Sequence, residues 1–318
     1  MRSRAAAVLL ILAAAGCGTQ AASVPAPEGP PEGSLLVQET RPCNWLRPPD
    51  PDKCDPVGLV RIGLDGEVIE ELAPEPPMPM RPMALSRDRT TIAWAWNWEV
   101  SVMGVDGEAP RTVSEKLLAE NMGETALDPT WTPDGSEILY RWSGANGEET
   151  WYLMSAATGA LNKIPMPVEC HAMSWAPDSG HVACEVWADQ DATEVDLYLV
   201  DMETLEATEL TESGDQIDSY TPDWSPDGRW LAFARRSDDA DRVAEADGIW
   251  VLEVDTGRAI RVAPGAVRTP SWSPDGGYLA AYDEEQGKII IVGRDGSGLT
   301  VLDHEARRFI GPRWLVSG

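Results

Sequence analysis

Two cysteines and two histidines lie close together near the middle of the chain: Cys170, His171, His181 and Cys184. Thiolate and imidazole groups are preferred zinc ligands, and two of each would suit a tetrahedral site. A hairpin around Asp178 would set Cys170 opposite Cys184, with each histidine an odd number of residues from a cysteine. Successive side chains of a strand point to opposite faces, so the histidines would lie on the other face. The spacing favours a disulfide over a metal site.

Carboxylates are the other chemically capable groups, because the chain has 53 Asp and Glu residues. The segment DPDKCD, with Asp50, Asp52 and Asp55, has the density of a calcium loop but lacks the glycine and the closing glutamate. A solvated loop is the favoured interpretation. The chain also lacks G-x-S-x-G, H-E-x-x-H and a phosphate-binding loop. We therefore assign no cofactor and no catalytic residue, and the sequence favours a non-enzymatic role, although a catalytic pair among so many carboxylates cannot be identified from the sequence.

The charge excludes two classes of partner. The formal net charge is −28, and hydrophobic residues make up 43% of the 318 residues, as in a globular protein. Nucleic acid requires a basic surface, and so does electrostatic docking on anionic lipid. We expect neither.

The N-terminus predicts export. Arg2 and Arg4 precede an apolar run over residues 5–15, which is shorter than the roughly 20 residues of a membrane span. The sequence Ala14-Ala15-Gly16-Cys17 resembles the bacterial lipobox. The resemblance implies that residues 1–16 are a lipoprotein signal peptide and that Cys17 is acylated, as with palmitate. The alternative is an ordinary secretory signal.

Residues 17–33 are the lipidated Cys and an Ala/Pro/Gly-rich tether that would hold the folded part off the membrane. We expect the protein to be anchored to a bacterial membrane by lipid alone, facing the extracytoplasmic side. Four other cysteines allow three pairings. The local pairs Cys43–Cys54 and Cys170–Cys184 are the most economical, and an oxidising compartment would favour both.

A repeat organises the rest of the chain. Segments such as PTWTPDGSEILYRW, PDWSPDGRWLAFAR and PSWSPDGGYLAAYD align by eye. Their anchor residues recur every 42 to 49 positions, at Leu85, Trp131, Trp175, Trp224, Trp272 and Trp314. Pro, Asp and Gly after the tryptophan suit a tight hairpin. A period of about 45 residues with four short strands is typical of a propeller blade.

The two ends of the chain complete one another. Three strands are expected at 34–40, 58–64 and 68–72 without a first strand, and a first strand at 309–316 has no followers. We therefore predict an all-β fold over residues 34–318: a six-bladed β-propeller of four-stranded antiparallel blades. The C-terminal strand would join the N-terminal blade and close the ring.

The S-P-D-G hairpins resemble those of the TolB-like, WD-repeat-like propellers of bacteria, over nearly all of the mature chain. The resemblance implies the fold, and such folds host many functions. The hairpin containing Asp88 lacks the Pro and the Gly, so we interpret its blade as degenerate.

The long loops of the expected blades share one face and are acidic. The candidate binding residues are Asp189, Asp191, Glu194, Asp196, Asp238, Asp239, Asp241, Asp283 and Glu284. Function often resides on loops held by a rigid scaffold. This face would bind a basic partner or Ca²⁺; the alternative is that its charges only promote solubility.

The sequence thus favours a monomeric, surface-anchored lipoprotein that binds a protein or an envelope component without catalysis. One alternative is a hydrolase or lyase acting on extracellular or envelope polymers with carboxylates in the central channel. Another is an accessory or sensor subunit of an envelope system.

Overall fold

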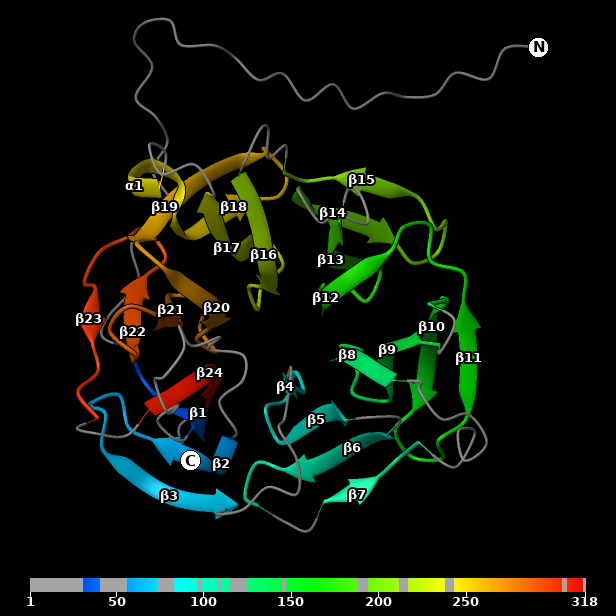
Figure 1. Ribbon diagram of the computed structural model, residues 1–318, viewed down its shortest axis with the longest axis horizontal. Coiled ribbons are helices and arrows are strands. Elements are labelled where there is room, and N and C mark those ends of the chain that lie inside the picture. The colour runs from blue at the N-terminus through cyan, green and yellow to red at the C-terminus, as the bar shows by residue number, and fades with distance from the viewer. Residues whose placement is uncertain are drawn as a thin grey trace, which may run out of the picture.

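The strands form a ring of six four-stranded antiparallel sheets (Figure 1). The computed structural model describes residues 31–40, 56–73, 83–96, 99–107, 110–114, 125–144, 147–187, 194–211, 217–237, 243–304 and 308–316. The prediction of a six-bladed propeller is confirmed. Among these residues, no helix combines the length and hydropathy needed to cross a bilayer.

The blades follow the chain in order, each running from the ring axis outward. Blade A contains β24 (Arg308–Leu315), β1 (Ser34–Thr40), β2 (Pro56–Ile62) and β3 (Val68–Ala73). Blade B contains β4 (Met83–Leu85), β5 (Thr91–Trp96), β6 (Glu99–Gly104) and β7 (Arg111–Thr112). Blade C contains β8 (Thr125–Trp131), β9 (Glu137–Ser143), β10 (Glu149–Ser155) and β11 (Leu161–Ile164).

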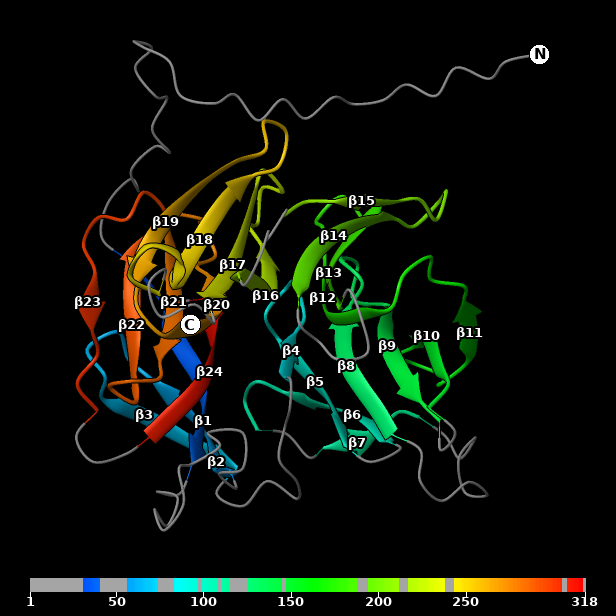
Figure 2. The same cartoon turned by 45° about the horizontal axis from the view of Figure 1, so that its top comes forward.

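The second half of the ring repeats this pattern. Blade D contains β12 (Cys170–Trp175), β13 (His181–Trp187), β14 (Val195–Asp201) and β15 (Ala207–Glu209). Blade E contains β16 (Ile217–Trp224), β17 (Trp230–Ser237), β18 (Gly248–Glu253) and β19 (Arg258–Pro264), with a short helix α1 (Val243–Ala246) between β17 and β18. Blade F contains β20 (Val267–Trp272), β21 (Tyr278–Asp283), β22 (Lys288–Gly293) and β23 (Thr300–Val301). Figure 2 shows the outermost strands along the perimeter.

The S-P-D-G segments form the tight hairpins between first and second strands. In blade E the hydroxyl of Ser225 donates to Asp227 at 2.6 Å and accepts from the Trp230 amide at 2.9 Å. Asp227 also accepts from the Arg229 amide at 3.1 Å. Gly228 completes the turn at φ +73°, a conformation that glycine adopts without steric cost. The aspartates of these hairpins therefore have a local structural role.

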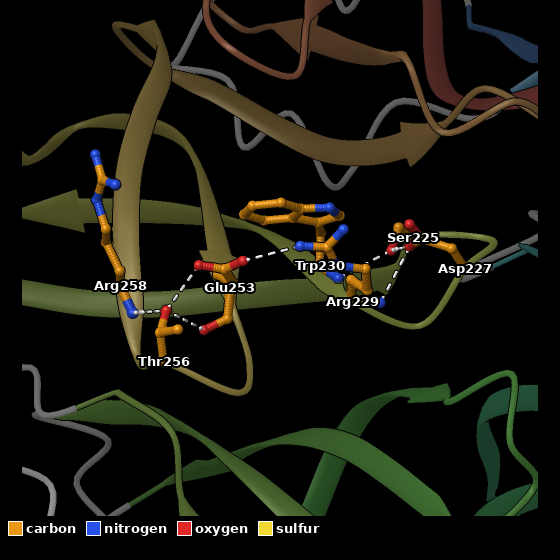
Figure 3. Close-up of polar contacts among 7 residues, drawn as sticks. All are labelled: Ser225, Asp227, Arg229, Trp230, Glu253, Thr256 and Arg258. Atoms are coloured by element: carbon orange, nitrogen blue, oxygen red, sulfur yellow. Dashed lines mark hydrogen bonds and ion pairs between the residues drawn. The ribbon is translucent and has the colours of Figure 1, made fainter. Parts of the chain in front are cut away.

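The turn between third and fourth strands lies beside this hairpin (Figure 3). Glu253 accepts from the Arg229 guanidinium at 3.2 Å and from the Thr256 hydroxyl at 2.9 Å. Thr256 in turn accepts from the Arg258 amide at 3.4 Å. Both kinds of tight turn thus share one face of the ring, which we call the hairpin face. The second strands end and the third strands begin at the opposite face, which we call the loop face.

The core lies between blades rather than in one central mass. Each of six hydrophobic clusters joins two neighbouring blades. The repeated tryptophans pack there: Trp272 lies between blades E and F, and Trp314 between blades F and A. Both are almost completely buried. Aromatic side chains of this size contribute much of the apolar area that holds neighbouring blades together.

Strand β24 closes the ring by pairing with β1 (Figure 1, red beside blue). In this pairing Trp314 lies opposite Leu35. The Trp314 indole also donates to the carbonyl of Glu32 at 2.8 Å, across 282 positions of sequence. The first and the last described strands are therefore part of one blade, as the sequence predicts.

Five of the six inner strands contain a bulge that the sequence pattern did not predict. The pairing register shifts just before each repeated tryptophan. The residue at the bulge has a positive φ in every case: Asp128 (52°), Ala172 (29°), Thr221 (50°), Thr269 (52°) and Gly311 (59°). Four of the five precede a proline, which has no N–H to donate. A bulge bends its strand locally and changes the direction of the side chains beside it.

Candidate functional site

A cavity of about 500 Å³ lies on the ring axis. Its lining comes from the ends of the inner strands and from the first hairpins, so it lies toward the hairpin face. Prolines and tryptophans form much of the wall, including Pro129, Pro222, Trp131, Trp175 and Trp224. The volume falls within the roughly 300–1,000 Å³ of ordinary ligand pockets.

One position of the repeat, directly before the tryptophan, links three pairs of neighbouring blades around this cavity. Its side chain accepts from the tryptophan amide of the following blade. The acceptors are Ser174 for Trp224 (3.4 Å), Asp223 for Trp272 (2.9 Å) and Ser271 for Trp314 (3.1 Å). These bonds position the wall of the cavity.

Arg313 occupies the same position in blade A but cannot accept a hydrogen bond. Its Nε instead donates to the carbonyl of Met83 in blade B at 2.9 Å, and its Nη1 donates to the carbonyl of Pro312 at 3.0 Å. At the boundary between blades A and B this side chain therefore donates a hydrogen bond to the next blade, whereas Ser174, Asp223 and Ser271 accept one. The result is a guanidinium in the wall of the cavity.

The hairpin of blade B places two more arginines at the cavity. Arg89 has φ +60° at the position that Gly135, Gly228 and Gly276 take in other blades. Its guanidinium donates to the carbonyl of Trp314, and to that of Trp272 at 3.0 Å. The side chain thus connects blade B to blades A and F.

Arg87 stands where the other described first hairpins have proline, as in Pro226 of blade E. It donates to the carbonyl of Pro226 at 3.2 Å. Blades B and E lie on opposite sides of the six-bladed ring, so this exposed side chain crosses the mouth of the cavity.

Desolvation dominates the electrostatics of the inner charges. It lowers the pKa of Arg89 and of Arg313, and the nearby Asp223 carboxylate opposes both shifts. Desolvation also raises the pKa of Asp223, against the effects of Arg313, the Trp272 amide and Arg89. All three residues remain half-buried because the cavity reaches them.

The other two carboxylates that line the cavity have partners in their own blades. Asp88 accepts from the Ser86 hydroxyl at 2.6 Å within its hairpin. Asp128 lies 2.9 Å from the Arg141 guanidinium, which also contacts Glu149 at 2.9 Å. The guanidinium groups of Arg89 and Arg313 therefore share the Asp223 carboxylate, and Asp275 of the blade F hairpin also acts on Arg89.

Glu185 is a buried acid beside this ring. Its Oε1 accepts from the amide of Thr221, the bulge residue of blade E, at 2.6 Å. Burial is the main reason that its pKa rises to about 7, and the Asp128 carboxylate raises it further. Glu185 therefore joins blades D and E, and it takes up a proton as the pH falls through about 7.

The structure joins Cys170 and Cys184 in a disulfide, with 5.3 Å between the Cα atoms. The two neighbouring histidines have other contacts. His171 stacks on Trp187 with 4.6 Å between ring centroids, and His181 lies 2.9 Å from Asp178. Among the described residues, no group of three or more His, Cys, Asp or Glu is arranged to hold a metal ion. Cys17, Cys43 and Cys54 lie outside the described residues.

Most of the predicted acidic face also lies outside the described residues: Asp189, Asp191, Asp238, Asp239 and Asp241. Glu194 directly precedes β14 and is half-buried. The other three described acids bond within the fold: Asp196 to Thr211, Asp283 to Gln286 and Glu284 to Arg268. The prediction of a binding face there stays a prediction.

The sequence reasoning missed the cavity charges Arg87, Arg89, Asp223 and Arg313. A signal for them was present, because each departs from its own repeat. Two arginines replace the hairpin proline and glycine, and a charged residue replaces Ser or Thr before the tryptophan. In a repeat protein, such departures mark positions where one blade differs from its sisters.

Comparisons with known proteins agree on the propeller. A family model described as the TolB beta propeller domain matches residues 86–306. The crystal structure of TolB from Acinetobacter baumannii is similar with a TM-score of 0.70 and 18% identity, over 92% of this chain and 68% of that one. A chain of the nidogen/laminin complex has a TM-score of 0.61 and 11% identity, over 89% of this chain and 98% of that one. At such identities, the similarity shows the fold alone.

A similar sequence is the "Uncharacterized peptidase YuxL" of Bacillus subtilis (strain 168). It is 26% identical over 180 residues, which cover 46% of this chain and 26% of that protein. The chain therefore matches about a quarter of that protein's length.

Proposed function

The chain belongs to the TolB beta propeller domain family, and from this premise we propose that it is an exported, lipid-anchored protein that binds a protein partner without catalysis. The partner would insert a segment into the cavity at the hairpin face. The observation that carries the proposal is the cavity of about 500 Å³ on the ring axis. A rigid ring of inner strands surrounds it, and rigid concave sites with a mainly apolar wall are typical ligand sites.

The disulfide supports export. Cys170 and Cys184 are both completely buried in blade D. Disulfides form and persist in oxidising compartments and are rare where thiols are kept reduced. Lipid attachment at Cys17 rests on the lipobox resemblance, and replacing Cys17 with Ser should move the protein from the membrane fraction to the soluble envelope fraction.

The roles of the carboxylates favour binding over hydrolysis. Asp88 stabilises its hairpin, Asp128 pairs with Arg141, and Asp223 accepts from the Trp272 amide. Each of the three lining carboxylates is thus accounted for by the fold. A hydrolase or lyase would need a carboxylate pair about 5–9 Å apart that addresses a substrate. Finding polymer cleavage that Asp223→Asn abolishes would favour that alternative.

The acidic loop face is the competing surface. Three of its four described members already bond within the fold, so the cavity is the better supported site. A basic partner or Ca²⁺ at the loop face remains the alternative. A role as an accessory or sensor subunit is compatible with either surface, because it specifies the system that the partner belongs to rather than the site.

Photo-crosslinking in native cells tests the proposal. A photoreactive amino acid would replace Pro133 at the cavity, Glu194 at the loop face or Ile69, an exposed residue of the outer strand β3. We expect one protein adduct from the Pro133 position and none from Ile69. An adduct from Glu194 alone would assign binding to the loop face. Absence of a protein adduct at both sites would overturn the protein-binding role.

A further inference from the structure

The inner guanidinium groups of the cavity have more donors than the fold uses. Each guanidinium carries five N–H groups. In the described part of the chain, Arg89 uses Nη1 and Nη2 for the carbonyls of Trp314 and Trp272. Arg313 uses Nε and Nη1 for the carbonyls of Met83 and Pro312. Both side chains line the cavity and are half-buried, and their remaining N–H groups have no hydrogen-bond acceptor among the described residues.

The nearby acids are engaged by the fold. Asp223 interacts with both Arg89 and Arg313, and one of its oxygens already accepts from the Trp272 amide. Asp88 and Asp128 are held in their own blades. Asp275 also acts electrostatically on Arg89, while its Oδ1 accepts from Ser273 within the hairpin of blade F. A ligand carboxylate at Arg89 and Arg313 would form charge-assisted hydrogen bonds that these acids do not supply.

Five more unpaired donors belong to residues of the cavity lining, but these atoms are themselves buried. They are the hydroxyls of Thr221 and Thr269 and the indole N–H groups of Trp131, Trp175 and Trp224, among the described residues. Because these atoms lie beneath the surface of the wall, the accessible donors for a ligand are those of the guanidinium groups.

We propose that the cavity binds a carboxylate group between the guanidinium groups of Arg89 and Arg313. Arginine suits this role because its planar fork matches the two oxygens of a carboxylate. The prolines and tryptophans of the wall would hold an apolar body attached to the carboxylate. The inference rests on the proposed function, because it assigns the chemistry of the ligand to the same cavity.

A carboxylate of this kind could come from two sources: the C-terminal residue of a partner's peptide segment, or a free organic acid with an apolar body. Both present the same group to Arg89 and Arg313. They differ in the length of the molecule attached to the carboxylate, since a peptide would continue past Arg87 at the mouth of the cavity. Matched probes therefore distinguish them.

Equilibrium dialysis with mass spectrometry tests the proposal on the purified folded chain. The first probe is a pool of N-acetylated tetrapeptides with free carboxyl ends, and its control is the same pool amidated. The second probe is phenylacetate, with phenylacetamide as control. We expect at least tenfold preference for one acid over its matched amide. Preference in the first pair assigns a peptide terminus; preference in the second pair alone assigns a free organic acid.

Two variants locate the site. Arg89→Gly installs the residue that three sister hairpins have at this positive φ, so the hairpin should still fold. It should reduce the acid preference to less than threefold. Arg313→Lys keeps the positive charge but loses the planar pair of donors that matches a carboxylate. It should reduce the preference for the acid over its amide at least threefold. The matched control is Arg229→Gln, on the hairpin face but outside the cavity lining, which should bind as the wild type does.

The proposal is wrong if the wild type shows no preference for either acid, or if folded Arg89→Gly keeps the full preference. A protein adduct at the Pro133 position without any acid preference would retain the cavity as the binding site and reject carboxylate recognition. Acid preference without a protein adduct would retain carboxylate recognition and reject the protein partner.

Discussion

Trp272 donates two hydrogen bonds to Asp223 across the boundary between blades E and F. The Asp223 carboxylate accepts from the Trp272 amide at 2.9 Å, and the Trp272 indole donates to the Asp223 carbonyl at 3.0 Å. The neighbouring blades use Ser174 and Ser271 for the first of these bonds. Asp223 therefore adds a negative charge to a link that a neutral hydroxyl also makes, and that charge interacts with Arg89 and Arg313.

Asp223→Ala should lower the free energy of unfolding by about 3 kcal/mol, because it orphans a buried amide and removes the counter-charge of two arginines. Ser271→Ala is the matched control and should cost about 1 kcal/mol, since it removes a neutral acceptor only. Asp223→Asn should fall between them. Urea unfolding measures all three. Equal costs for the two alanine variants would show that the charge of Asp223 contributes nothing.

Glu185 should make stability depend on pH. Its folded pKa of about 7 exceeds its ordinary value of 4.5, so the folded state binds the extra proton. Its contribution to stability is full below pH about 4.5 and is lost as pH rises through about 7. The loss amounts to about 3 kcal/mol at most.

Glu185→Gln keeps an acceptor for the Thr221 amide and removes the titration. We expect the variant to be more stable than the wild type at pH 8, with the difference disappearing near pH 4.5. Urea unfolding across this range tests the expectation. The hairpin aspartates Asp88, Asp134 and Asp178 have lowered pKa values and lose stability on acidification, but they do so in both proteins. A constant difference between the two proteins at all pH values would contradict the assignment.

The parts of the fold set by local chemistry were predictable. Pro, Asp and Gly after Trp224 determine a hairpin within four residues, and the recurrence of the tryptophan gives the number of blades. The bulges were not predictable in this way. Thr221 and Asp128 precede proline, which normally favours an extended conformation, yet the closed ring holds both at positive φ.

The cavity charges escaped prediction because their partners are distant in sequence. Arg89 donates to carbonyls 183 and 225 positions away, and Arg313 donates to a carbonyl 230 positions away. Nothing local distinguishes a buried arginine of this kind from a solvated one. The sequence pattern of the Arg89 hairpin indicates a degenerate blade. The two residues that replace Pro and Gly there, Arg87 and Arg89, supply the side chains that reach across the ring.

Reducing the disulfide should destabilise blade D. Cys170 and Cys184 close a short loop, for which the chain-entropy model gives about 3 kcal/mol. A Cys170→Ser, Cys184→Ser double variant should lose this amount in urea unfolding under non-reducing conditions. Dithiothreitol should lower the stability of the wild type further than that of the double variant. Equal sensitivity of the two proteins would place the redox effect elsewhere in the chain.

Removing β24 should open the ring. Truncation before Phe309 deletes Trp314, which is completely buried between blades F and A. We expect aggregation, or rapid cleavage by a low dose of protease. Trp314→Ala is the milder companion variant and should cost about 3–5 kcal/mol. A truncated protein that stayed monomeric in gel filtration and resisted protease would show that the remaining blades are stable without closure.

The position of β24 also sets the order of events when the protein is made. A chain that crosses a membrane in sequence order delivers β1, β2 and β3 long before their inner neighbour arrives. Until then β1 presents an open edge, which could pair with another chain. Strand β24, the last of the described strands to be synthesised, thus covers the exposed edge of β1. The ring is therefore complete only after β24 is made: a chain that is arrested earlier, however many blades it has completed, keeps an aggregation-prone edge at β1.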